Sequence, residues 1–247
     1  MVRPTEARKI DSLSLPVDIR AQPDETTCGP TCLDAVYRFY GDDVTLETVI
    51  AETGRLEQGG TLAVFLACHA LARGYIATIY TYNLQVFDPS WFRDPGIDLR
   101  ERLQAQARHK RSAKLRVVTN AYLEFLERGG RVRFRELSAP LIRKYLKQAV
   151  PILTGLSATY LYQTPREHGP KSDYDDVRGE PSGHFVVLCG YDASNQNVRI
   201  ADPLLPNPMA DGQYYTVGMN RLIGAIYLGV LTYDANFLVV EPRERTR

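Results

Sequence analysis

The stretch QPDETTCGPTC, residues 22–32, decides the fold, because it places a cysteine where a loop turns into a helix. The residues after it, LDAVYRFYG, have the pattern of an amphipathic helix that starts near Cys28 and stops at Gly41. Pro30 supports this start, since proline is favoured in the first helical turn. The unpaired N–H groups and the dipole of a helix N-terminus help a thiol to lose its proton. Capping or packing is the ordinary role of such a cysteine, so a functional Cys28 requires partners elsewhere in the chain.

The composition is that of a globular protein without a bulk charge. The 247 residues are 44% hydrophobic and 24% charged, with 30 Lys and Arg against 29 Asp and Glu. This balance gives no electrostatic reason to expect a nucleic acid or a membrane surface as a partner. The chain has no segment resembling a signal peptide and no apolar run of ~18 residues, so we expect a cytoplasmic protein. In a chain of this length, the four cysteines are expected to be free thiols.

Helical patterns dominate the first half of the chain, and strand patterns dominate the second half. Helices are expected at 28–40, 45–53, 61–74, 98–110, 113–128 and 138–148. Strands are expected at 75–82, 131–137, 151–162 (one bent strand or a pair), 183–192, 197–203 and 237–242. This order favours an α+β domain, in which the helical half carries Cys28 and an antiparallel C-terminal sheet carries its partners.

His184, in the strand GHFVVLCGYD, is the candidate general base. If the hairpin that follows turns about Ser194, Asp202 lies opposite Val186 and therefore on the same face as His184. A register error of one residue would place the two on opposite faces. Asp192, the competing carboxylate, lies at the turn, where aspartate usually forms the turn itself. A lone histidine in an apolar strand is usually structural, but one with an aspartate on the same face fits a catalytic pair.

Gln22 completes the set, because its side-chain amide could stabilise an oxyanion beside the backbone N–H of Cys28. Together the four residues supply an oxyanion donor, a nucleophile, a base and a group that orients the base, which is the set that acyl transfer requires. Cys32, one helical turn beyond Cys28, raises the alternative of a Cys/Cys/His/Asp metal site. Closed metal ligation would remove the oxyanion chemistry, so we expect Cys32 to pack against the sheet and expect neither a metal nor a cofactor.

The chain resembles the family of bacterial papain-like cysteine peptidases that includes the double-glycine leader-processing domains of bacteriocin exporters. The resemblance lies in the string Q-x5-CGP at a helix start, a later GHFVVL-x-GYD strand and a following ADP. It covers residues of about 20–50 and 150–205, and it implies a papain-like fold. It further implies the role of each residue: Gln22 as oxyanion glutamine, Cys28 as nucleophile, His184 as general base and Asp202 as the residue that orients it.

The exporter domains are accompanied by membrane spans and an ATPase, so this chain resembles the stand-alone members of the family. We expect a single papain-like domain over residues 1–247, with insertions around 83–149 and 163–182. The segment 163–182 is too long and too polar for a plain hairpin loop, which fits a binding flap or a floppy insertion.

The function expected from these residues is hydrolysis of a peptide bond in a peptide or protein substrate, through a Cys28–His184–Asp202 triad and an acyl-enzyme. Two alternatives remain open at the level of the sequence. One is an amidase or acyl transferase on the same scaffold, and the other is a non-catalytic peptide-binding module. The acceptor pocket would distinguish the first alternative from a peptidase. The effect of Cys28→Ala would distinguish the second alternative from an enzyme.

Overall fold

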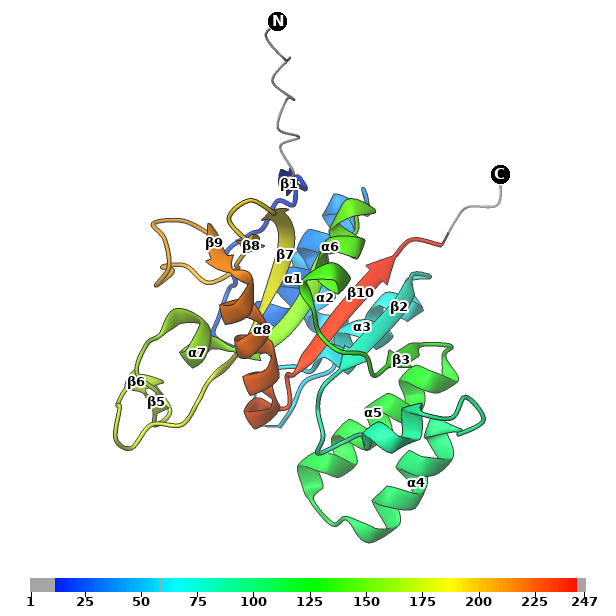
Figure 1. Cartoon of the computed structure of the whole chain (residues 1–247). Helices are drawn as coiled ribbons and strands as arrows, with labels where there is room; N and C mark the ends of the chain where they lie inside the picture. Colours follow the sequence, from blue (N-terminus) through cyan, green and yellow to red (C-terminus); the bar gives the residue numbers. More distant parts are fainter. Residues whose placement is uncertain (1–11, 58, 244–247) are drawn as a thin grey trace, which may run out of the picture.

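The core of the protein is a mostly antiparallel sheet with helices on both faces (Figure 1). The computed structural model describes residues 12–57 and 59–243. Its strands follow the order β3-β2-β10-β4-β7-β8-β9, and β1 pairs with the far end of β7. The β2–β3 pair is parallel, and the other pairs of this sheet are antiparallel. The strands of the sheet are β1 (Ser12–Ser14), β2 (Ile76–Thr81), β3 (Arg131–Arg133), β4 (Ile152–Ser157), β7 (Gly183–Asp192), β8 (Asn197–Ala201), β9 (Tyr214–Gly218) and β10 (Asn236–Glu241).

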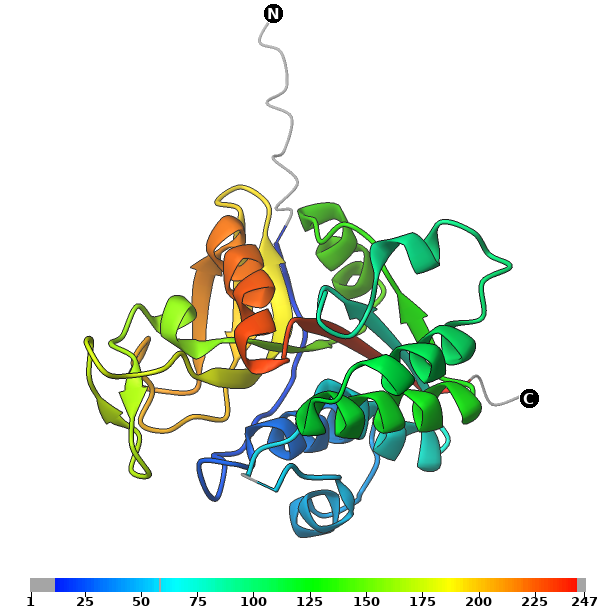
Figure 2. The same cartoon turned by 90° about the horizontal axis from the view of Figure 1, so that it is seen from below.

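Helices cover the sheet on both faces, which confirms the predicted α+β class (Figure 2). On one face, α1 packs against β7 and α3 against β2, while α5 packs on α3. On the other face, α6 packs against β7 and β4, and α8 packs against β4. The helices are α1 (Cys28–Phe39), α2 (Leu46–Glu52), α3 (Ala63–Ala72), α4 (Leu99–His109), α5 (Ala113–Glu127), α6 (Ala139–Lys147), α7 (Ala158–Tyr162) and α8 (Met219–Leu228), with 3-10 turns η1 (Pro89–Phe92) and η2 (Gly229–Thr232).

Local chemistry sets the ends of these helices close to the predicted positions. The hydroxyl of Thr45 accepts a hydrogen bond from the N–H of Thr48 at 3.2 Å and so caps α2. Ser112 caps α5 in the same way through the N–H of Leu115. After α1, Gly41 takes a φ of 76°, a left-handed conformation that glycine adopts without strain and that stops the helix.

The segment 151–162 is predicted as one bent strand or a pair of strands, and this prediction is wrong for the second half of the segment. Strand β4 ends at Ser157, whose hydroxyl accepts from the N–H of Tyr160 and starts the short helix α7. The aromatic residues of ATYLY favour a strand locally, but a capping serine followed by tertiary packing against α8 outweighs this preference. This change of direction matters for the site, because α7 carries Tyr162.

The sheet also draws strands from both halves of the chain, in contrast to the predicted separation of helices and strands. Strand β2 lies beside β10, with Ile79 opposite Leu238, although the two are far apart in the sequence. Strand β9 and helix α8, in the segment that carried no prediction, complete one edge and cover β4. A two-strand ribbon, β5 (Glu167–His168) and β6 (Asp173–Tyr174), orders part of the predicted flap segment.

Candidate active site

Cys28 is the first residue of α1, as the sequence predicts, and its side chain is buried, with 9% exposure. The backbone bond that closes the first turn runs from the N–H of Thr31 to the carbonyl of Thr27 at 3.0 Å. The N–H groups of Cys28 and Gly29 therefore precede the bonded part of the helix and remain available to a ligand. A glycine is required at position 29, because a Cβ there would lie 2.4 Å from the methyl group of Thr61.

His184 lies near the start of β7 and is hydrogen-bonded to Asp202, with 2.8 Å between Nε2 and Oδ1. Both residues are buried. The pairing depends on a β-bulge, because the register at the turn, where Asp192 lies opposite Asn197, would by itself place the two side chains on opposite faces. The shift between Leu188 and Gly190 changes that register. It thereby brings Asp202 to the face of His184.

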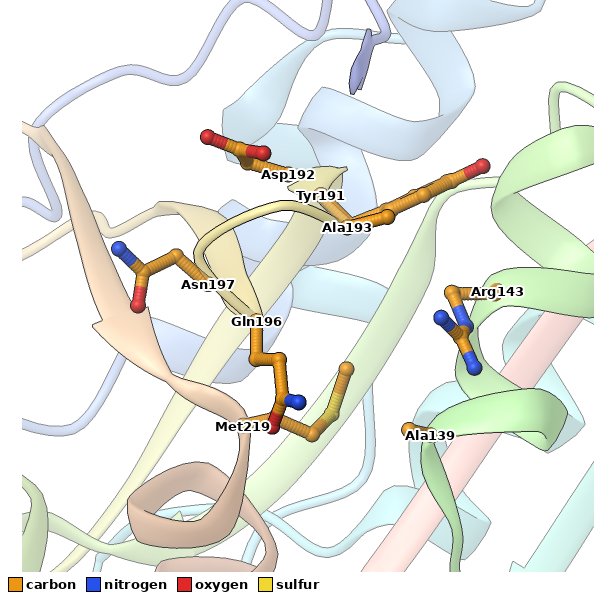
Figure 3. Close-up of a pocket in the computed structure, with 8 residues that line it drawn as sticks. All are labelled: Ala139, Arg143, Tyr191, Asp192, Ala193, Gln196, Asn197 and Met219. Atoms are coloured by element: carbon orange, nitrogen blue, oxygen red, sulfur yellow. The ribbon is translucent and has the colours of Figure 1, made fainter. Parts of the chain in front are cut away.

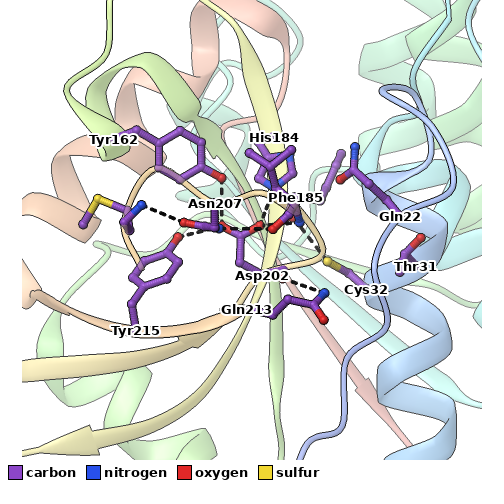
Figure 4. Close-up of polar contacts among 12 residues, drawn as sticks. Gln22, Thr31, Cys32, Tyr162, His184, Phe185, Asp202, Asn207, Gln213 and Tyr215 are labelled. Carbon is purple, nitrogen blue, oxygen red and sulfur yellow. Dashed lines mark hydrogen bonds and ion pairs between the residues drawn. The ribbon is translucent and has the colours of Figure 1, made fainter. Parts of the chain in front are cut away.

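Two tyrosines that the sequence did not identify hold the other oxygen of Asp202 (Figure 4). The hydroxyls of Tyr162, from α7, and Tyr215, from β9, both donate to Oδ2, at 2.8 and 2.7 Å. Oδ1 accepts a further bond from the N–H of Leu204 at 2.9 Å, in addition to the bond from His184. The carboxylate therefore accepts four hydrogen bonds, which satisfy a buried charge that would otherwise be very unfavourable.

The charges of the site stabilise one another. Burial alone would lower the pKa of His184, but the charge of Asp202, together with the charge and hydrogen bonding of Cys28, raises it to about 10. Burial would raise the pKa of Asp202, but His184 and the hydrogen-bond donors hold it below its usual value. Burial and the Asp202 charge raise the pKa values of Tyr162 and Tyr215, so both stay protonated as donors. A charged His184–Asp202 pair beside Cys28 is the arrangement that supports a nucleophilic thiolate.

Gln22 lies beside this cluster but is engaged differently from the expectation. Its side-chain Nε2 donates to the carbonyl of Asp24 at 2.9 Å, and its Oε1 is buried without a hydrogen-bond partner among the described residues. Its backbone N–H donates to the carbonyl of Pro203 at 2.9 Å, which ties the loop before α1 to the segment after Asp202. One N–H of the amide is left to act on a ligand, because an NH₂ group has two donors.

Cys32 packs against the sheet, where its Sγ donates to the carbonyl of Phe185 at 3.2 Å (Figure 4). Burial raises its pKa well above the ordinary value, and the charges of Cys28 and Asp202 add to this effect. Cys32 is therefore a poor thiolate and a poor metal ligand. Within residues 12–57 and 59–243, no group of three His, Cys, Asp or Glu side chains is arranged to hold a metal ion.

A separate cavity of about 160 Å³ lies at the other end of the β7–β8 hairpin (Figure 3). The side chain of Asp192 there accepts bonds from Ser194 and Asn195 and so shapes the turn. Asp192 is therefore a turn former, as predicted. The length of β7 separates this cavity from His184, by roughly 26 Å for eight residues of extended chain.

Comparisons with known proteins relate part of the chain to a peptidase family. Residues 109–227 match the model of the Peptidase_C39 like family. This segment, just under half of the chain, is similar to that family. The match contains His184 and Asp202, and it begins after Gln22 and Cys28. It supports peptidase function for the chain. No curated protein sequence matches the chain.

Several solved structures resemble the chain at low sequence identity. A structure described as a C39-like peptidase from Bacillus anthracis has a TM-score of 0.52 and 14% identity, covering 95% of this chain and 100% of that chain. A double glycine motif protease from an AMS/PCAT transporter, in complex with the leader peptide, has a TM-score of 0.44 and 16% identity, covering 93% and 94%. The cysteine protease xylellain from Xylella fastidiosa has a TM-score of 0.44 and 14% identity, covering 94% and 86%. The first likeness shows the papain-like fold.

Among the described residues, none of the helices is both long enough and apolar enough to cross a membrane.

Proposed function

We propose that this C39-like chain is a cysteine peptidase that hydrolyses a peptide bond in a peptide or protein substrate. The observation that carries the proposal is the buried His184–Asp202 pair, with 2.8 Å between Nε2 and Oδ1. Cys28, at the start of α1, helps to raise the pKa of this histidine through its charge and hydrogen bonding. The match to a peptidase family over 109–227 supports the choice of substrate class.

The chemistry follows from which atoms are already occupied. Because Nε2 of His184 is bonded to Asp202, Nδ1 is the nitrogen that exchanges a proton with Cys28. The Cys28 thiolate attacks the carbonyl carbon of the substrate, and the tetrahedral intermediate collapses as His184 donates its proton to the leaving amine. A water molecule then attacks the thioester while His184 accepts its proton. Release of the carboxylic acid returns the sulfur and the imidazolium to their starting state.

The oxyanion of the intermediate would be held by the backbone N–H of Cys28 and the unoccupied N–H of the Gln22 side chain. The positive end of the α1 dipole adds to this stabilisation. The backbone N–H of Gln22 donates to the carbonyl of Pro203, and this bond holds the Gln22 loop beside the segment that carries Asp202. Together these groups would stabilise the negative charge that develops on the carbonyl oxygen.

We also propose that residues 1–247 form one domain, with 83–149 and 163–182 as insertions in the papain-like core. The segment 163–182 joins α7 to β7, so its two ends adjoin Tyr162, which donates to Asp202, and Gly183, which precedes His184. That placement supports a role in closing over the substrate.

The proposed activity can be tested with a peptide library prepared from a proteome, in which new peptide ends are identified by mass spectrometry. We expect the wild type to generate new ends and Cys28→Ala to generate none. Cys68→Ala is the matched control, since it removes a partly buried thiol of α3 and should leave cleavage unchanged. Cleavage that persists in Cys28→Ala, or a wild type that binds peptides without cutting them, would overturn the proposal.

A further inference from the structure

The charge of the chain is distributed unevenly, although the whole chain is nearly neutral. Residues 99–149 hold 14 of the 30 Lys and Arg residues but only 4 of the 29 Asp and Glu residues. The rest of the chain therefore holds 16 Lys and Arg residues against 25 Asp and Glu residues. Such an asymmetry indicates a surface that meets a partner of opposite charge. The proposed mechanism uses none of these cations.

The densest part of this positive charge lies at the tip of the hairpin that α4 and α5 form (Figure 1). The last turn of α4, the loop and the first turn of α5 contain no carboxylate. Five exposed cations lie there, and together they define the basic tip: Arg108, Lys110, Arg111, Lys114 and Arg116. No ion pair within residues 12–57 and 59–243 involves a member of the basic tip.

The basic tip is not explained by the stability of its helices. The first turn of α5 carries Lys114 and Arg116 and contains no acidic residue. These cations lie at the positive end of the helix dipole, where a negative charge is the favourable choice. The positive end of α5 and the five cations together attract an anion, and a bound anion offsets their mutual repulsion.

The basic tip lies at the end of the sheet that carries His184. Nζ of Lys114 lies 4.4 Å from the centroid of the Tyr233 ring. The next residue, Asp234, lies against Gly183, because a Cβ at Gly183 would be 2.5 Å from its Oδ2. Gly183 begins β7 and precedes the candidate base. Two contacts therefore lead from the basic tip to the neighbour of His184.

Helix α5 is anchored at the same end of the sheet by a further contact. The hydroxyl of Tyr122 donates to Oδ1 of Asn236, the first residue of β10, at 3.4 Å. Asn236 lies opposite Gly155 of β4, and Gly155 lies opposite Phe185 of β7. Two strand spacings, roughly 10 Å, thus separate this anchor from the residue that follows His184. A polypeptide bound at the candidate active site can therefore extend toward the basic tip, at ~3.3 Å per extended residue.

We propose that the basic tip binds an acidic segment of the polypeptide substrate, outside the residues that flank the scissile bond. The inference rests on the proposed peptidase function, and it adds the chemical class of a segment that the substrate presents. A nucleic acid or an anionic membrane matches less well, because an extended polyanion would also meet the excess of carboxylates in the rest of the chain. A short acidic segment meets the basic tip alone.

Binding to the basic tip can be measured with a synthetic acidic peptide. The probe is a fluorescein-labelled peptide of alternating Glu and Ala, and its neutral counterpart alternates Gln and Ala. The full chain with Cys28→Ala is used for every binding measurement, so that neither probe is cut. Fluorescence anisotropy gives the dissociation constants at low and at physiological salt, because salt weakens an exposed electrostatic contact.

The tip variant combines Arg108→Gln, Arg111→Gln and Arg116→Gln. All three side chains are exposed, and glutamine is a good helix former, so we expect the variant to fold. Lys110 and Lys114 are left unchanged, because their Nζ atoms contact other segments and help to hold the hairpin in place.

The β3 variant, with Arg131→Gln, Arg133→Gln and Arg135→Gln, is the matched control. It makes the same change of charge in the same positive segment, at exposed side chains beyond the other end of α5. The 15 residues of α5 place the two sets roughly 20 Å apart.

We expect the acidic probe to bind the tip variant roughly 3- to 100-fold more weakly than the unaltered tip, the range of three exposed charge contacts. The β3 variant should bind it as the unaltered tip does. Equal affinity of the tip and β3 variants overturns the proposal. Tighter binding of a single-stranded oligonucleotide, or of phosphatidylglycerol vesicles, overturns the assignment to a polypeptide. If the tip variant does not fold, the two probes decide: equal affinity for the acidic and the neutral probe overturns the proposal.

A cleavage profile connects the basic tip to the substrate. A proteome-derived peptide library is cut by the wild type and by the tip variant, both with Cys28 intact. Wild-type sites should carry Asp and Glu residues on one side of the scissile bond, and the tip variant should lose this enrichment while other sites are still cut. Wild-type cleavage without acidic enrichment overturns the inference and leaves the peptidase proposal intact. A wild type that cuts nothing overturns the peptidase proposal and, with it, the substrate role of the basic tip.

Discussion

At the scale of the residue, the site is organised around one buried carboxylate. Asp202 accepts from His184 and Leu204 on one oxygen and from Tyr162 and Tyr215 on the other. Removing a donor from this set leaves a buried charge with fewer partners, which costs more than the removal of a neutral hydrogen bond. The tyrosines are therefore positioning residues that keep Asp202 ionised and oriented toward His184.

Tyr215→Phe should lower the free energy of unfolding by about 1.5–3 kcal/mol, because it removes a hydrogen bond to a charged group. With one donor fewer, the pKa of folded Asp202 should lie closer to its unfolded value, so acidification below about pH 4 should cost the variant less stability than it costs the wild type. Chemical denaturation across acidic pH measures both effects. Tyr82→Phe is the control, since the buried hydroxyl of Tyr82 has no hydrogen-bond partner in the described part of the chain. An equal effect in the two variants would contradict the positioning role.

The His184–Asp202 pair should also give stability a defined pH window. The raised pKa of His184 means that its contribution is complete below the unfolded value of ~6.5 and is lost as pH rises through about 10. The lowered pKa of Asp202 means that its contribution is present above ~3.9 and is lost as pH falls further. The unfolding free energies of wild type and His184→Ala should therefore differ most between about pH 3.9 and about pH 6.5. A difference that stays constant up to about pH 11 would contradict the charged pair.

The four candidate residues could be predicted from the sequence because local patterns indicate them: a helix start, an alternating strand and a turn. Tyr162 and Tyr215 carry no such signal, since they reach Asp202 from different elements through the fold. Residues that act through tertiary proximity could not be derived from spacing alone.

At the scale of the element, strand β7 is the support of the site. It pairs with β4 and β8 along its length, and β1 is added near the bulge, where Ser14 lies opposite Gly190. Next to its turn, the β7–β8 hairpin has a register that differs by one residue from the register that the sequence suggested, and the bulge compensates for this difference. His184 and Asp202 therefore lie on the same face, as expected. The cause is the bulge, which the alternation of side chains could not predict.

Gly190→Ala tests the contact between β1 and this strand. A Cβ at position 190 would lie 2.4 Å from the carbonyl oxygen of Leu13, so alanine requires β1 to move. We expect a loss of about 1–3 kcal/mol in unfolding free energy, the usual range for overpacking. Gly212→Ala is the matched control, because a Cβ there meets nothing within 4 Å. Thermal or chemical unfolding measures the difference, and equal stability of the two variants would contradict the account.

At the scale of the whole molecule, the segment 83–149 is joined to the core at several points. Helix α5 packs on α3, and α6 packs on β4 and β7. The hydroxyl of Tyr122 donates to Asn236 of β10 at 3.4 Å. These contacts are those of an insertion that shares the core, which is why we propose one domain.

The single tryptophan provides a test of that proposal, because Trp91 lies in this segment and packs edge-on against Phe87. We expect denaturant unfolding followed by Trp91 fluorescence to coincide with unfolding followed by far-ultraviolet circular dichroism, which reports the whole chain. A fluorescence transition at lower denaturant, with the sheet still folded, would show that the segment unfolds by itself.

The most direct test of the central claim is the rate at which iodoacetamide alkylates Cys28 as a function of pH, in wild type and His184→Ala. Peptide mapping separates Cys28 from the other three thiols, of which Cys32 and Cys189 are buried. If Cys28 and His184 form a nucleophilic pair, the wild-type rate is already high near pH ~6 and collapses in the variant. A rate that increases only near pH ~8.5, the value of an ordinary thiol, and that does not depend on His184 would contradict the account.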